Sequence, residues 1–130
     1  MGARSYSTEE ATDTTLVTTT EAVICTLPGV STDRPGQTVR LTGMAKITNG
    51  TGTTALNLRI RRDSLTGTEV SESNVVQIET AAASTEDHGI NADDPISGEV
   101  AGQVYVLTAQ QTGASANGTS VYAYLRADIG

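Results

Sequence analysis

The stretch TVRLTGMAKIT at residues 38–48 decides the fold class, because apolar and polar side chains alternate along it. One set of alternate positions is apolar or small: Val39, Leu41, Gly43, Ala45 and Ile47. Successive side chains of a β-strand point to opposite faces, so this two-residue period predicts a half-buried strand. The stretch TALNLRIRR at 54–62 repeats the pattern, with Leu56, Leu58 and Ile60 on one face. The NGTG segment between the two stretches is a strong turn signal and predicts a hairpin.

Weaker strand signals continue on both sides of this pair. Residues 14–27 are rich in β-branched side chains and predict one or two strands, which Pro28 and Gly29 should end. Residues 75–83 predict a strand of moderate quality, and 104–109 alternate clearly. Residues 84–99 are polar and contain glycine and proline, so we expect a long connection with at most one short strand.

The last stretch, TSVYAYLRADI at 119–129, predicts the closing strand. Its two faces differ in character: Val121, Ala123, Leu125 and Ala127 lie on one, Tyr122, Tyr124 and Arg126 on the other. Seven or eight strands with frequent turn signals predict an antiparallel β-sandwich or jelly roll.

The composition supports an all-β chain with one domain. Among 130 residues there are 22 threonines and 13 glycines but one lysine, a bias toward strands and turns and away from surface helices. One domain over residues 14–130 fits this length. Residues 1–13 are polar and lack a sustained period, so we expect a flexible N-terminal arm.

Charge and hydropathy limit the possible partners. The net charge is −7, which repels phosphate backbones and argues against nucleic-acid binding. No apolar run is long enough to span a membrane, and the N-terminus MGARSYSTEE lacks the apolar segment of a secretory signal. The single cysteine excludes an internal disulfide framework.

Candidate catalytic and metal-binding residues are few. His88, between acidic residues, is best explained as an exposed loop histidine, and Cys25 as a small buried apolar residue. The acidic loop with Asp93 and Asp94 could bind Ca²⁺, but its spacing matches no EF-hand, and a solvated loop explains it better. We therefore expect no enzyme activity, no cofactor and no metal site.

The residues that favour contact with another protein lie on two predicted strands. Tyr122 and Tyr124 lie opposite the aliphatic face of the last strand, where a lone sandwich would expose them, and tyrosine is favoured in interfaces. Arg126 shares that face, and Arg59 and Arg61 form a basic cluster that could pair with acids of a neighbour. These five residues form the predicted subunit interface.

The chain from Thr38 to Leu125 resembles small β-sandwich proteins encoded among the head genes of tailed bacteriophages. The resemblance is carried by TVRLTGMAKITNGTGTTALNLRIRRDSLTGTEV and AGQVYVLTAQQTGASANGTSVYAYL, as a style of strands and turns. It implies a jelly-roll subunit, a homotrimer, which decorates the outer capsid or forms a head fibre or spike. It also implies that Tyr122 and Tyr124 lie between subunits, and that the arm at 1–13 grips the major capsid protein or another head protein.

The function expected from these features is that of a structural virion protein, made in the host cytoplasm and carried on the outer capsid surface. It would stabilise the head or present a surface. The alternative is a carbohydrate- or host-surface-binding module of a phage fibre or tail, since jelly rolls are common lectin scaffolds. Exposed tyrosines could serve as its sugar platform, although Trp and Phe are absent.

Overall fold

The computed structural model describes residues 4–10, 15–32, 36–48, 55–75, 85–95, 101–112 and 117–129. Every regular element in these residues is a strand: β1 (Arg4–Glu10), β2 (Thr15–Thr18), β3 (Ala22–Val30), β4 (Thr38–Thr48), β5 (Ala55–Arg62), β6 (Glu69–Val75), β7 (Thr85–Pro95), β8 (Gln103–Thr112) and β9 (Asn117–Ile129). The described part of the chain thus contains nine strands, against the seven or eight expected.

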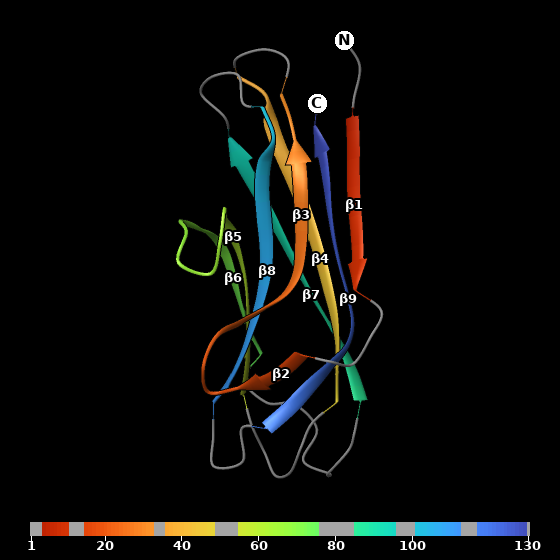
Figure 1. Cartoon of the computed structure of the whole chain (residues 1–130), viewed down its shortest axis with the longest axis vertical. Coiled ribbons are helices and arrows are strands. Elements are labelled where there is room, and N and C mark those ends of the chain that lie inside the picture. The colour runs from red at the N-terminus through yellow and green to blue at the C-terminus, as the bar shows by residue number, and fades with distance from the viewer. Residues whose placement is uncertain are drawn as a thin grey trace.

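The strands form two antiparallel sheets that pack face to face (Figure 1). Sheet A has the order β1-β9-β4-β7, and β2 pairs with the first part of β9, before the part paired with β1. Sheet B has the order β3-β8-β5-β6. Most neighbours within a sheet are distant in sequence, as jelly-roll connections require. The predicted all-β antiparallel sandwich is therefore confirmed.

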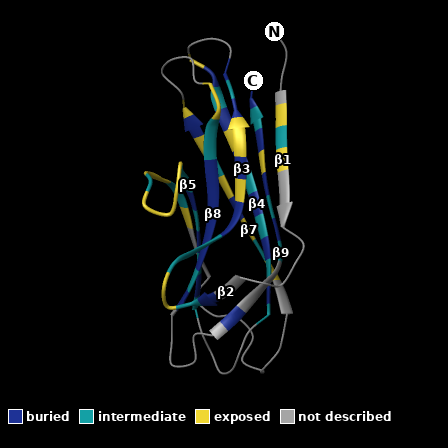
Figure 2. Ribbon diagram, in the orientation of Figure 1, coloured by how far each residue is buried: buried dark blue, intermediate teal, exposed yellow. Residues whose placement is uncertain are grey.

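The core lies between the sheets and is built from the inward faces that alternation predicted. Strand β4 shows this most regularly, since Val39, Leu41, Ala45 and Ile47 are buried and the intervening side chains are not. Figure 2 shows the buried residues continuing along the middle strands of both sheets. Aliphatic side chains fill most of this core, and the single large aromatic ring fully buried among the described residues belongs to Tyr105.

Strands β4 and β5 do not form the predicted hairpin. β4 pairs with β7 and β9 in sheet A, whereas β5 pairs with β6 and β8 in sheet B. Both strands bury the predicted apolar face, so these faces meet across the core instead of lying side by side. Alternation determines which face is buried, but it does not select the neighbouring strand. The turn expected at 49–52 lies outside the described residues.

Two other stretches differ from the predictions or lie beyond them. Strand β6 at Glu69–Val75 was not predicted, and the strand expected at 75–83 lies, apart from Val75, outside the described residues. The polar stretch expected to be a connection forms the eleven-residue edge strand β7. Ile90 is its one large apolar side chain facing inward, so the apolar period is too weak to see. Acidic residues and a terminal proline are typical of a protected sheet edge.

The segment expected to be a flexible arm is partly a strand. Residues 4–10 pair along β9 from Arg4–Ile129 to Glu10–Ala123. Tyr6 packs against the core, and its hydroxyl donates a 3.5 Å hydrogen bond to the carbonyl oxygen of Ser31 after β3. Backbone pairing and this ring together hold a polar segment that has no apolar period of its own.

Strand β3 continues through the break expected at Pro28 and Gly29. Its register with β8 shifts between Leu27 and Val30, so the two residues lie in an irregularity of the ladder. Proline is tolerated at such a position because it has no N–H to pair, and Gly29 adopts a φ of 77° there.

Candidate functional site

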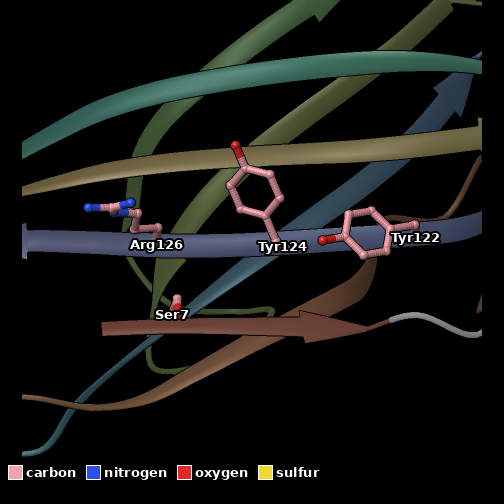
Figure 3. A pocket seen from close by; sticks show the side chains of 4 residues that line it. All are labelled: Ser7, Tyr122, Tyr124 and Arg126. Atoms are coloured by element: carbon pink, nitrogen blue, oxygen red, sulfur yellow. The ribbon is translucent and has the colours of Figure 1, made fainter. Parts of the chain in front are cut away.

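A hollow of about 260 Å³ lies on the outward face of sheet A. It is lined by Ser7 of β1 and by Tyr122, Tyr124 and Arg126 of β9. We call it the tyrosine hollow. Figure 3 shows the three β9 side chains in a row, with Tyr122 directed toward Tyr124 and Ser7 on the neighbouring strand. The structure therefore brings three of the five predicted interface residues together.

Strand alternation explains why these side chains face outward. Ala123, Leu125 and Ala127 are fully buried, so the residues between them must point away from the core. The two tyrosine rings are half-buried, with centroids 6.4 Å apart and planes at 66°. An edge-to-face pair of this kind places the positive ring edge near the negative ring face. The face opposite the aliphatic side of β9 therefore carries a half-buried tyrosine pair.

Arg126 is anchored at one end of the hollow by its own strand. Its Nε and Nη2 atoms donate hydrogen bonds of 3.1–3.2 Å to the Asp128 carboxylate, which also accepts a 2.6 Å bond from the Ser5 hydroxyl. The Ser5 and Arg126 hydrogen bonds together hold the pKa of Asp128 below its usual range. The guanidinium next to the tyrosines is therefore charge-balanced.

Arg59 and Arg61 lie on the outward face of the other sheet, where they surround Glu21. Arg61 donates to both Glu21 oxygens, at 2.7 and 2.9 Å, and Arg59 donates at 3.3 Å. The Thr108 hydroxyl adds a 2.6 Å bond, and these contacts, Arg61 foremost, lower the pKa of Glu21. Arg59 also pairs with Glu69 and Glu72. The predicted interface is thus divided between two faces, and its sheet B half is neutralised within the chain.

A second polar cluster joins the two sheets. Asp94 of β7 is buried and accepts hydrogen bonds from Arg62 of β5 and from the Tyr105 hydroxyl of β8, the latter at 2.6 Å. Burial, helped by the Asp94 carboxylate, raises the pKa of the Tyr105 phenol. The sequence favours a solvated acidic loop around Asp94, and this expectation is wrong: Asp94 is a buried strand residue paired with an arginine and a tyrosine.

The two remaining candidates for catalysis lie in strands. Cys25 is buried in β3, as expected. His88 is in β7 on the same face as Ile90 and is half-buried, so the expectation of an exposed loop histidine is wrong. Within the described ranges, no three His, Cys, Asp or Glu side chains are grouped so that they could hold a metal ion. Nor does any helix in those ranges have the length and apolar character needed to cross a membrane.

Sequence reasoning missed Ser7, Glu21 and Asp128. Each of them lies beside or bonds to a residue on another strand that is distant in sequence. Alternation along one strand does not predict which strands are neighbours, so it could not identify these residues. The one available signal was the outward position of Asp128, two residues after Arg126 on the same face.

The comparisons with known proteins identify the fold. No family model matches the chain, and no curated protein matches it by sequence. Solved structures do match, and five of them come from infectious bursal disease virus. The fold is shared with chains of icosahedral virus particles. The T13 viral particle matches with a TM-score of 0.63 at 10% identity, the T=1 particles with 0.62 at 11%, and the VP2 subviral particle with 0.60 at 13%.

Each match covers 96% of this chain but only 31% or 32% of the viral chain. The described sandwich therefore corresponds to about a third of a larger viral protein. At these identities the likeness concerns the path of the backbone, and it does not transfer residues or activities.

Proposed function

We propose that this chain is a structural virion protein, carried on the outer capsid surface and made in the host cytoplasm. The observation that carries the proposal is the alignment of 96% of the chain with a viral-particle chain at a TM-score of 0.63. The bacteriophage head resemblance in the sequence supports the same class of protein. The chain would decorate or project from the capsid, and it would stabilise the head or present a surface.

The proposed partners are other copies of the chain and the major capsid protein or another head protein. The sequence resemblance implies a homotrimer, so light scattering after size exclusion should give three times the 13.4 kDa chain mass. Capsids that lack the protein should bind it during co-sedimentation. A monomer that does not sediment with such capsids would contradict the proposal.

We propose no catalytic role for the chain. Cys25 and His88 are the side chains that could have carried one, and Cys25 lies in the core. The variants Cys25→Ser and His88→Ala should therefore keep capsid binding and oligomeric mass unchanged. A hydrolytic or transfer activity that His88→Ala abolishes would show that this view is wrong.

A second candidate, a carbohydrate- or host-surface-binding module, is favoured by the tyrosine hollow. Two aromatic rings, a hydroxyl and a guanidinium line that concave site, and small-ligand sites combine apolar surface with a few polar groups. The two functions are compatible, since a protein on the capsid exterior can present a binding site. A glycan array that includes host cell-wall material tests this candidate, and the absence of any saturable binding would remove it.

A further inference from the structure

The outward face of sheet A is mostly polar outside the tyrosine hollow. Among the residues whose side chains the structure describes, its large apolar ones are Tyr122, Tyr124 and Met44, and register places Met44 beside Tyr124. The other described side chains on this face are polar, charged or small. Stable subunit contacts have an apolar, well-packed centre. A partner protein with a flat surface would also leave the hollow empty, so its lining residues would lose van der Waals contacts. The face is therefore a poor centre for a subunit contact.

The hollow suits a small ring better than a flat surface. Its volume of about 260 Å³ lies below the usual range for drug-sized ligands, about 300–1,000 Å³. The ring of Tyr124 offers an electron-rich face to weakly positive C–H groups. Arg126 and Ser7 line the same hollow and supply hydrogen-bonding groups, the guanidinium directed along β9 away from Tyr124 and the hydroxyl from the neighbouring strand β1 (Figure 3). An apolar face with hydroxyls at its rim is the chemistry of a sugar ring.

The charges around the hollow select against acidic ligands. Arg126 is already paired with Asp128 through two of its nitrogens, so it can donate further hydrogen bonds but supplies little net positive charge. Lys46, the register neighbour of Tyr122, is also the register neighbour of Asp87 on its other side. The chain as a whole carries a net charge of −7, which repels anions.

We propose that the tyrosine hollow binds a neutral pyranose sugar, with the sugar ring against Tyr124 and its hydroxyls on Arg126 and Ser7. The inference rests on the second function proposed above and specifies its ligand. It requires that the hollow stay open to solvent on the assembled particle. It therefore competes with the use of Tyr122 and Tyr124 as a subunit contact, and one set of variants separates the two.

The test titrates the purified full chain with glucose and with glucuronic acid, which differ only at C6, and with the matched pair galactose and galacturonic acid. Backbone amide shifts in NMR spectra report the site. Tyrosine fluorescence reports the rings directly because the chain has no tryptophan. We expect saturable shifts at the hollow residues with a neutral sugar and several-fold weaker binding of its acid.

Variants then assign the binding to the hollow. Tyr124→Ala should weaken binding about tenfold, the scale of one lost aromatic contact. Tyr124→Phe keeps the ring and should bind within about twofold of wild type, which guards against a misfolded alanine variant. Asn91→Ala, exposed on β7 of the same face, is the matched control and should bind normally.

Three results would overturn the proposal: no saturable response to any neutral sugar of the panel, wild-type binding by Tyr124→Ala, or a change of oligomeric mass in Tyr124→Ala. The last result would place the tyrosines between subunits. Co-sedimentation with capsids measures capsid binding, and so tests the proposed virion role independently of sugar binding. If Tyr124→Ala loses sugar binding but still sediments with capsids, the sugar site and the virion role both stand.

Discussion

The Tyr105 hydroxyl donates a 2.6 Å hydrogen bond to Oδ2 of Asp94, and this contact joins β8 of sheet B to β7 of sheet A. Both side chains are buried, with exposed fractions of 0% and 2%. Arg62 of β5 completes the cluster through its hydrogen bonds to the same carboxylate. A buried carboxylate is tolerated when it is paired and hydrogen-bonded in this way. The cluster therefore fixes the position of one sheet edge over the other sheet.

Replacing Asp94 should destabilise the fold more than replacing Tyr105. Asp94→Ala leaves the buried Tyr105 hydroxyl without its acceptor and breaks the ion pair of Arg62, whose side chain is 36% exposed, at a combined cost of about 2–3 kcal/mol. Tyr105→Phe leaves the Arg62 ion pair intact and should cost about 1–2 kcal/mol. Urea denaturation measures both free energies of unfolding. If both variants lose the same free energy of unfolding, the ion pair between Arg62 and Asp94 contributes nothing to stability.

Tyr105 should also make the fold sensitive to alkali. Burial raises the pKa of its phenol above the ordinary value of 10.0. The stability that the neutral, hydrogen-bonded phenol adds to the fold is therefore fully present below pH 10.0 and is lost as the pH rises through the folded-state pKa. From about pH 8 to about pH 11, the urea concentration at the unfolding midpoint should fall more for wild type than for Tyr105→Phe. The same fall in both proteins would contradict the assignment to Tyr105.

Glu21 should carry much of the stability on the outward face of sheet B. Glu21→Gln removes the charge that faces Arg59 and Arg61 and should cost about 1–3 kcal/mol. Glu69→Gln is the matched control: its side chain is 42% exposed, so its loss should cost less than about 1 kcal/mol.

The pKa of Glu21 is lowered below its ordinary value of 4.5, so its contribution is present above that pH and is lost as the pH falls through the folded-state pKa. Thermal melts of wild type and Glu21→Gln should therefore converge in acid. If the difference in melting temperature between wild type and Glu21→Gln stayed constant as the pH falls, the ion pairs of Glu21 with Arg59 and Arg61 would not be its cause.

Gly67 should tolerate no side chain in the turn between β5 and β6. A Cβ atom there would lie 1.6 Å from the backbone oxygen of Arg62, so the hairpin would have to open. Gly67→Ala should cost about 2 kcal/mol or more. Gly89→Ala is the control, because its Cβ would make ordinary contact at 3.7 Å, and its melting temperature should stay near that of wild type.

Tyr6 should hold β1 in sheet A. Tyr6→Ala removes the one ring that ties this strand to the core, and the amide protons of residues 4–10 should then exchange faster with deuterium. Ser7→Ala, the next residue on the outward face, should leave exchange in β1 nearly unchanged. If both variants exchange like wild type, backbone pairing with β9 alone retains the strand.

The sequence by itself determined that this protein is all-β and which side chains of β4, β5 and β9 face inward. That information is local: the two-residue period follows from the geometry of one strand. Tertiary structure alone decided that β4 neighbours β7 and β9 instead of β5, and that polar segments such as Thr85–Pro95 become strands. It also decided that Asp94 meets Tyr105 and that Ser7 lines the same hollow as the tyrosines. Pairing between distant strands depends on the summed burial and hydrogen bonding of both sheets, which no single stretch of sequence contains.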